Sequence, residues 1–398
     1  MKNVRSLVCI LAATFLLSGC WDRYELEERA NVLGLAVDLA ENESENEVTH
    51  QSGEFPDEEK NPSYKVTAQI ALPGKIKLGP EGGGGEGSEK TAWILETYGH
   101  TLRDAMANLQ QQLAEKLYLG HLQIIVLSDE VAKTGIGDIN EYLRRNYEVR
   151  RTAWMIVNKK DAAKVLRAAP PLETVPALYL SDTLDNAVRF GKLPREYLGK
   201  FWIDVSDMGV DPVLPGVKVI NNDRILVDGL AYFRGEKMVG LTNPMEIGTF
   251  MDMKEKSSGG YPISLSLDDH DGVFIVETQE RKSDIKVDIK DGKPTATIKV
   301  EVDANIDEAI GATLNGPLVE KIEKKANEIT EENCMKLLKQ LQEKGSDVLG
   351  LGARIRAKHS AYWKTEVKTE DKWAEVFKDM EIKVSFDYTI RRTGMDWE

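Results

Sequence analysis

Hydrophobic and polar residues follow two different periods along this chain, and each period predicts a different kind of element. Between residues 64 and 72 most alternate positions are hydrophobic, which is typical of a strand with one buried face. Between 101 and 117 hydrophobic residues recur every three or four positions, which predicts a helix, and Thr101-Leu-Arg-Asp104 resembles a capping box at its start. Comparable patterns predict further strands at 31–38, 91–98, 123–127, 152–157, 218–220, 224–233, 263–266, 273–278, 285–289, 295–302 and 381–391.

Strands and helices alternate in the first half of the chain, which favours an α/β arrangement there. The second half has a series of strands followed by one long helix at 318–342, which Gly345 is expected to end. Asp291-Gly292 predicts a tight hairpin turn between two of these strands. The expected fold class is therefore mixed α/β, or α+β, with more than one domain. The shorter helices of the first half are expected at 136–145, 161–167 and 182–190.

Prolines recur between residues 170 and 215, and this stretch is the expected region between domains. We divide the chain into residues 1–19 as a signal peptide, 20–205 as an N-terminal mixed α/β domain and 206–398 as a C-terminal α+β region. A further division of that last region near residue 270 is left open.

Two other stretches have no hydrophobic period and are expected to be exposed loops. The segment 41–62 is acidic and polar, and the segment 80–88 is rich in glycine. A phosphate-binding loop is the alternative for the second segment. It lacks the Lys-Ser/Thr ending of such loops and carries two glutamates that would repel phosphate, so the flexible loop is favoured.

The start of the chain has the pattern of an export signal. Lys2 and Arg5 precede an apolar run at 7–17, which is too short for a membrane-spanning helix of roughly 20 residues. The next residues, Leu17-Ser18-Gly19-Cys20, resemble a bacterial lipobox. In such a sequence the cysteine thiol takes a diacylglyceryl thioether, and the new α-amine is then acylated.

Two lipid chains on Cys20 would hold the chain stably to a membrane, where one chain would be marginal. The alternative is a chance cysteine in a buried strand. The basic start, the apolar length, the small residues and the position all favour the lipobox. We therefore expect an exported protein that is lipid-anchored through Cys20.

Charge and cysteine content narrow the class of partner. The chain has 398 residues with 52 Lys and Arg against 66 Asp and Glu, and loss of Lys2 and Arg5 takes the net charge from −14 to −16. This charge argues against nucleic acid as a partner and against an electrostatic grip on anionic lipid. Because Cys9 lies in the signal and Cys20 is expected to be lipidated, Cys334 has no partner left for an intramolecular disulfide.

The search for catalytic or metal-binding groups gives no positive candidate. The five histidines are not spaced for metal ligation, and the segment 268–272 is better explained as an exposed turn. Cys334 lies at helical spacing with leucines, so a packed core thiol is favoured over a nucleophile. We expect no catalytic residue, no metal and no other cofactor. The pairs Arg144-Arg145 and Arg150-Arg151 leave two alternatives open: an anion or partner site, or solvated and salt-bridged charges, which are more common.

Several short blocks spread along the whole chain resemble the Ger(x)C family, the C subunits of bacterial spore nutrient-germinant receptors. One departure is the segment 357–362, where the family has a proline before the tryptophan. The blocks are Gly19-Cys20-Trp21-Asp22-Arg23-x-Glu25-Leu26-x-Glu28, Gly120-His121-x-x-x-Ile125, Arg145-Asn146-x-Glu148-x-Arg150-Arg151, Asp347-Val-Leu-Gly350-Leu-Gly352, Trp363, Trp373, Phe377 and Ile390-Arg391-Arg392-Thr393-Gly394.

The resemblance implies several domains with large, mainly antiparallel sheets packed by helices. It implies a lipoprotein on the outer face of the spore inner membrane, which works with the germinant-receptor A and B membrane subunits in the response to small nutrients. No catalytic activity is implied, and the only functional residue carried over is Cys20. The expected function is a lipid-anchored, non-enzymatic C subunit.

Two other functions stay open. In the first, the chain is an extracytoplasmic lipoprotein that itself binds the small nutrient, at a domain interface near the proline-rich middle, and passes it to a membrane partner. The second, a surface hydrolase, ranks well behind because no catalytic grouping supports it.

Overall fold

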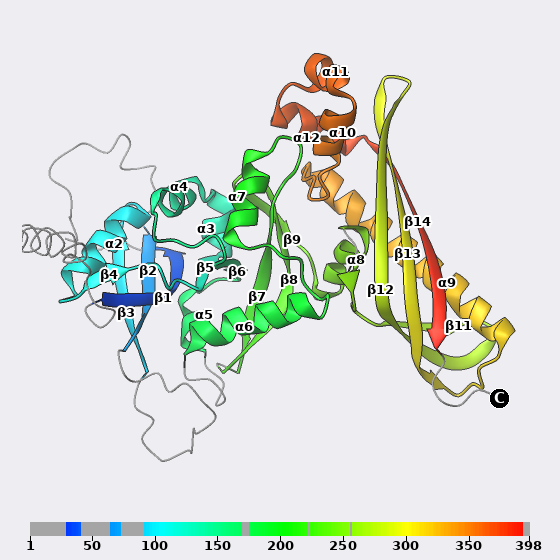
Figure 1. Cartoon of the computed structure of the whole chain (residues 1–398), viewed down its shortest axis with the longest axis horizontal. Helices are drawn as coiled ribbons and strands as arrows, with labels where there is room; N and C mark the ends of the chain where they lie inside the picture. The colour runs from blue at the N-terminus through cyan, green and yellow to red at the C-terminus, as the bar shows by residue number, and fades with distance from the viewer. Residues whose placement is uncertain are drawn as a thin grey trace, which may run out of the picture.

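Two β-sheets, joined and covered by helices, form the body of the protein in this computed structural model (Figure 1). The expected signal peptide, the lipobox and both expected loops lie outside the described residues. The described residues are 29–40, 64–72, 91–168, 175–221, 223–254 and 257–392.

The first sheet is mixed, and within the described residues it contains nine strands in the order β3-β2-β1-β5-β6-β7-β8-β9, with β4 beside β1. Strand β1 runs parallel to β4 and β5, and the pairs β5–β6 and β6–β7 are also parallel. The other pairs are antiparallel. The strands are β1 (Arg29–Leu39), β2 (Tyr64–Ala71), β3 (Ala92–Gly99), β4 (Lys116–Tyr118), β5 (Ile124–Ser128), β6 (Trp154–Asn158), β7 (Val213–Ile220), β8 (Arg224–Arg234) and β9 (Lys237–Leu241).

Helices cover both faces of this sheet. One layer contains α2 (Leu102–Gln111), α3 (Asp129–Thr134), α4 (Gly137–Arg145) and α7 (Leu198–Ser206), and the other contains α5 (Ala163–Arg167), α6 (Pro176–Arg189) and α8 (Pro244–Lys254). The predicted period of β2 is confirmed, because its alternating hydrophobic side chains are buried under the first layer. The predicted cap is confirmed as well, since the Thr101 hydroxyl accepts a hydrogen bond from the Asp104 amide.

The second sheet has the order β10-β12-β13-β14, with β11 beside β12. Its strands are β10 (Ser257–Ser258), β11 (Ile263–Leu267), β12 (His270–Lys290), β13 (Lys293–Ile310) and β14 (Glu381–Arg392), and only β13–β14 is a parallel pair. The hairpin turn at Asp291-Gly292 is confirmed. The prediction of separate strands at 273–278 and 285–289 was wrong, because β12 continues through the polar stretch between them.

Helix α9 (Gly316–Lys344) packs along the second sheet, and Gly345 ends it in a left-handed conformation, as predicted. After it come α10 (Leu351–Lys358), α11 (Ser360–Tyr362), a π-helical turn (Trp363–Val367) and α12 (Glu370–Lys378). The expected mixed fold with large sheets packed by helices is confirmed. The domain limits stay a prediction, and the first sheet has strands on both sides of the expected limit at residue 205.

The outer edge of β14 is closed by side chains of α9. The amides of Phe386, Tyr388 and Ile390 donate to Glu331 Oε1 at 3.0 Å, Asn327 Oδ1 at 3.0 Å and Glu323 Oε1 at 2.7 Å. The three acceptors recur every four residues, so they lie on one face of the helix. A strand edge normally leaves such amides ready to pair with another strand, and here α9 takes that place.

The first sheet meets the C-terminal helices at a contact that we call the seam, formed by Gly209–Asp211 and Gly235 against Ser346–Ala353 and Trp373. The Asp347 carboxylate accepts from the Leu351 amide at 3.0 Å, the Gly352 amide at 2.7 Å and Trp373 Nε1 at 3.0 Å. Asp211 Oδ2 in turn accepts from the Asp347 amide at 2.8 Å, and its Oδ1 accepts from the Gly235 amide at 2.9 Å. Two buried carboxylates therefore fix the C-terminal helices to the first sheet.

A buried arginine makes a second connection between the sheets. Arg281 on β12 is 1% exposed and donates to the carbonyls of Met251, Gly259 and Gly191. Its Nη1 also lies 3.5 Å from Asp252 Oδ1. The guanidinium therefore joins β12 to α8 and to the end of α6, and its burial explains why the middle of β12 does not look hydrophobic in the sequence.

We predict that Asp347→Ala strongly destabilises the protein. The change leaves three buried N–H donors without an acceptor, and each such donor costs about 1–3 kcal/mol. The free energy of unfolding, measured by urea denaturation of the chain without residues 1–20, should fall by more than about 3 kcal/mol. The exposed Asp379→Ala should change it by less than about 0.5 kcal/mol. A similar small loss in both variants would contradict this account of the seam.

The seam should also make stability depend on pH. Burial raises the pKa of Asp211 to about 7 and that of Asp347 to about 6. Between about pH 4 and pH 7 the folded chain then holds protons on these carboxyl groups that the unfolded chain has released. The protein therefore loses folding stability as the pH rises through that window. Urea denaturation at pH 5 and pH 8 should show a smaller difference for Asp211→Asn than for the unchanged protein. An equal difference would mean that Asp211 ionises normally in the fold.

Removing the three α9 acceptors should expose the edge of β14. We expect Glu323→Ala, Asn327→Ala and Glu331→Ala together to lower the free energy of unfolding by about 2–4 kcal/mol and to cause concentration-dependent association. Urea denaturation and light scattering measure the two effects. A matched triple variant of exposed α9 residues should keep both properties unchanged: Glu320→Ala, Glu328→Ala and Asn333→Ala.

Candidate functional site

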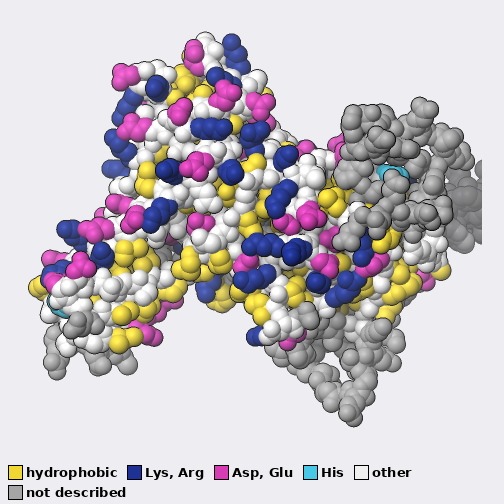
Figure 2. All heavy atoms as spheres, turned by 180° about the vertical axis from the view of Figure 1, so that it is seen from behind, with side chains coloured by type: hydrophobic (Ala, Val, Ile, Leu, Met, Phe, Trp, Pro, Cys, Tyr) yellow, Lys and Arg dark blue, Asp and Glu magenta, His cyan; other side chains and the backbone are white. Residues whose placement is uncertain are grey.

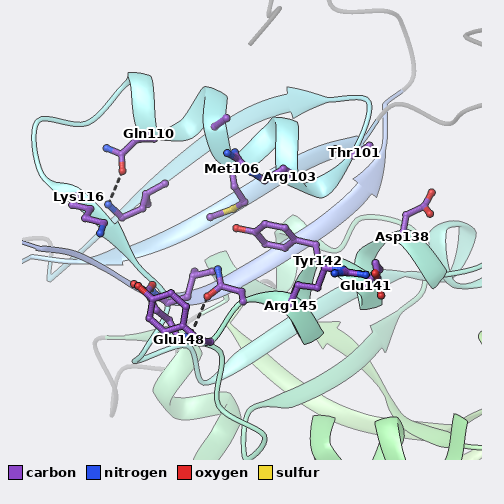
Figure 3. Close-up of a pocket in the computed structure, with 15 residues that line it drawn as sticks. Thr101, Arg103, Met106, Gln110, Lys116, Asp138, Glu141, Tyr142, Arg145 and Glu148 are labelled. Carbon is purple, nitrogen blue, oxygen red and sulfur yellow. Dashed lines mark hydrogen bonds and ion pairs between the residues drawn. The ribbon is translucent and has the colours of Figure 1, made fainter. Parts of the chain in front are cut away.

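An open groove of about 870 Å³ lies between α2 and α4 (Figure 3). Its floor is largely apolar and consists of Met106, Ala107, Leu117, Leu119 and Tyr142. The floor forms because α2 and α4 turn hydrophobic faces toward the same sheet and share one core there. Apolar floors with a few polar groups around them are typical of binding sites.

The rim of the groove carries charges of both signs. Arg103 on α2 and Lys116 on β4 lie on one side, and Asp138 and Glu141 on α4 lie on the other. Arg145 also lines the groove, and it pairs with Glu141 one turn earlier on the same helix. In the part of the chain that the structure describes, Arg103 and Asp138 have no salt-bridge partner, so both charges are available to a bound group.

Two side chains fix the walls of the groove. Gln110 Oε1 accepts from the Leu117 amide at 2.8 Å, and Glu148 Oε2 accepts from the Leu119 amide at 2.9 Å (Figure 3). Burial raises the pKa of Tyr142, so its hydroxyl stays protonated at neutral pH. The walls are therefore held by hydrogen bonds that exist without any ligand.

Tyr147 lines the groove with 89% of its surface exposed. The loop that carries it is held in place, because the Glu148 amide donates to Asn146 Oδ1 at 3.0 Å and the Asn146 amide donates to the Tyr142 carbonyl at 3.1 Å. The aromatic side chain is therefore presented outward by an ordered loop.

Two of the blocks that suggested the family, Gly120–Ile125 and Arg145–Arg151, meet beside this groove, where β1 begins. The Arg29 guanidinium lies 4.4 Å from the centre of the Tyr118 ring, and that ring contacts His121 at a centroid distance of 5.7 Å. A Cβ on Gly120 would lie 2.3 Å from the Tyr118 ring, so only glycine fits there. Burial and the nearby Arg150 and Arg29 lower the pKa of His121, which keeps the imidazole neutral at pH 7.

The arginine pairs have mixed roles. Arg145 pairs with Glu141, and Arg144 Nη2 donates to Ser206 Oγ at 3.0 Å. Arg150 and Arg151 are exposed. Figure 2 shows basic and acidic side chains mixed over the lobe of α10 to α12.

The other residues singled out in the sequence have structural roles or lie outside the described residues. Leu17, Ser18, Gly19 and Cys20 belong to the latter group. Cys334 is buried in the core, as predicted, and burial raises the pKa of its thiol well above the usual value. Asp268 and Asp269 form the expected turn between β11 and β12.

Among the described residues, no group of His, Cys, Asp and Glu could hold a metal ion. The helices of the described part are all too short or too polar to span a membrane.

The carboxyl groups with strongly raised pKa values are committed to the fold. Burial raises the pKa of Asp38 to about 6, and its oxygens accept from the Ala162 and Ala163 amides. Burial also raises the pKa of Asp252 to about 6, beside Arg281. Asp211 and Asp347 hold the seam in the same way. These groups act as acceptors for backbone and side-chain donors inside the protein.

The sequence did not predict the groove, because it depends on the approach of two helices that lie some thirty residues apart. The only signal was the charged block at 144–151, whose Arg145, Tyr147 and Glu148 line it. The structure places the groove within the first helix layer rather than in the proline-rich stretch 170–215.

Comparison with known proteins gives matches along nearly the whole chain. The family model described as spore germination protein N-terminal domain matches residues 22–219, and the model described as spore germination B3/GerAC-like C-terminal matches residues 228–394. The chain is 25% identical to spore germination protein KC of Bacillus subtilis (strain 168), with 97% of this chain and 96% of that protein covered. It is 24% identical to spore germination protein GerQC of Bacillus cereus, with coverages of 84% and 90%.

The fold also matches a solved structure. The crystal structure of the GerBC protein superposes with a TM-score of 0.55 at 19% identity and covers 86% of this chain and all of that chain. The likeness shows a shared fold, and the family models account for both halves of the sequence. This protein therefore belongs to the Ger(x)C family of spore germination proteins.

Proposed function

We propose that this protein is a lipid-anchored, non-enzymatic C subunit of a spore germinant receptor. The observation that carries the proposal is the match of two spore germination family models to both halves of the chain. The names of the relatives, spore germination proteins KC and GerQC, agree with it. The partners we propose are the A and B membrane subunits of the receptor, and the location is the outer face of the spore inner membrane.

The distance between the proposed anchor and the folded body is short. Strand β1 begins at Arg29, nine residues after Cys20, and an extended chain of that length spans at most about 30 Å. Lipidation of Cys20 would therefore hold the end of the first sheet, with the groove beside it, within about 30 Å of the bilayer surface. A subunit held at that height meets the parts of a membrane protein that stand just above the lipid.

A role without catalysis is supported by how the titratable groups are used. The carboxyl groups whose pKa values burial raises each accept hydrogen bonds or face a cation within the fold. Binding and positioning, rather than proton transfer, are the tasks that suit this arrangement.

A second candidate function is capture of the small nutrient by this chain itself, and the apolar floor and mixed charges of the groove favour it. Isothermal titration calorimetry of the chain without residues 1–20 against amino acids and sugars tests it directly. Heat of binding that disappears in Arg103→Ala would support this function, and flat titrations would remove it.

We predict that Cys20→Ala abolishes lipidation and membrane retention. Without the thiol no thioether forms, and an acidic chain without its lipid has little affinity for a bilayer. Mass spectrometry of the mature N-terminus and fractionation of membranes measure the two effects, and nutrient-triggered germination should fall with them. Cys9→Ala removes a cysteine from the expected signal peptide and should leave all three unchanged. A mature chain with an unmodified Cys20 would overturn the proposal.

A further inference from the structure

We propose that the groove between α2 and α4, together with Tyr147, is the docking site for an amphipathic helical segment that stands next to the membrane in a partner subunit. The inference rests on the proposed function, because it uses the lipid anchor to set the height of the groove. It names the surface of this chain and the chemistry of the segment that binds there.

The shape of the groove fits a helix better than a small molecule. It is open to solvent and follows α2, whose 10 residues correspond to about 15 Å or nearly three helical turns. Met106 and Leu119 are buried beneath the floor, and the half-buried Ala107, Leu117 and Tyr142 face apolar side chains spaced three and four residues apart on a partner helix. A single nutrient molecule would leave much of this apolar floor in water.

The charges of the rim determine which charged side chains the partner helix carries on either side of its apolar face. Arg103 on one side favours an acidic side chain, and Asp138 on the opposite side favours a basic one. Because Arg145 and Glu141 already neutralise each other, Arg103 and Asp138 dominate the two sides. Rim charges of this kind set orientation and partner choice more than affinity.

Tyr147 supplies an exposed aromatic side chain at the groove. Its side chain is 89% exposed although its loop is fixed by hydrogen bonds to Asn146 and Leu119. Tyrosine is enriched among the residues that carry most of the binding energy at protein interfaces. An exposed, rigidly presented tyrosine beside an apolar groove therefore extends the docking surface.

The lipid anchor proposed at Cys20 places the groove close to the membrane surface. Arg29 lies nine positions after Cys20, which limits the separation from the lipid to about 30 Å. Arg29 lies on β1 directly beside β4, whose Lys116 lines the groove. A short helix that emerges from the bilayer can reach a groove within about 30 Å of the lipid. A partner domain that lies far above the membrane would not require the groove to be so close to the lipid.

Site-specific photo-crosslinking in membranes that hold the complete receptor tests the proposal. p-Benzoylphenylalanine is placed at Ala107 in the groove or, as a control, at Ala357, an exposed alanine of α10. Linked peptides are identified by mass spectrometry. We expect Ala107 to link to a peptide adjoining a membrane span of another subunit and Ala357 to give no such link.

Two variants test the same contact by the amount of partner subunit that is recovered with this chain, with no crosslinking. Ala107→Trp fills the floor and should lower the amount of partner subunit recovered with this chain by about tenfold, which corresponds to about 1.4 kcal/mol, whereas Ala357→Trp should not. Arg103→Glu changes an exposed side chain, so folding is preserved, and it should weaken recovery in a salt-dependent way. Thermal unfolding of each variant checks that the fold is intact.

The outcomes separate this inference from the proposed function. If Cys20 is lipidated but Ala107 links only to a second copy of this chain, or to no polypeptide, the docking site is wrong and the lipoprotein function stands. If a free amino acid or sugar abolishes a link that forms at Ala107 without changing subunit recovery, the groove is a nutrient site and the inference is also overturned. If Cys20 is unmodified, the proposed function fails first.

Discussion

The buried carboxylate of Asp347 is the interaction on which the arrangement of the whole molecule depends. It accepts three hydrogen bonds from the chain that follows it, and the amide of the same residue donates to Asp211 on the other side of the seam. Placing two carboxylates in the interior is costly unless donors surround them, and here each oxygen has a donor. The C-terminal helices consequently have one position relative to the first sheet, and the second sheet follows from it.

The block Asp347-Val-Leu-Gly350-Leu-Gly352 has a structural explanation in this contact. Gly352 approaches Gly209 so closely that a Cβ there would meet Trp373, and Gly350 adopts a left-handed conformation. Trp373 is both the neighbour that excludes a side chain and the donor to Asp347. The block at 145–151, beside the groove, is of another kind, because its Arg150 and Arg151 are exposed. One block thus maintains the fold, and the other faces outward.

Local patterns identified the elements whose hydrophobic side faces one core, such as β2, α2 and α9, together with their caps at Thr101 and Gly345. These patterns failed where a buried residue is polar, and where an element is buried on more than one side. The middle of β12 looked like a break because its inward position is Arg281, whose charge is satisfied by carbonyls distant in sequence. Helix α8 was not predicted because it is buried on several sides and shows no helical period. The groove depends on tertiary packing and could not be predicted from either helix alone.

The first sheet begins near the proposed tether and the second sheet lies at the opposite end of the molecule (Figure 1). An open strand edge at that end would favour contacts that repeat from copy to copy. By occupying the amides of β14, the acceptors of α9 remove the backbone template through which neighbouring copies would otherwise join into a continuous ribbon. A contact between two copies at this edge would therefore have to be made by side chains, which can separate again, and not by a shared β-sheet that would make the contact permanent.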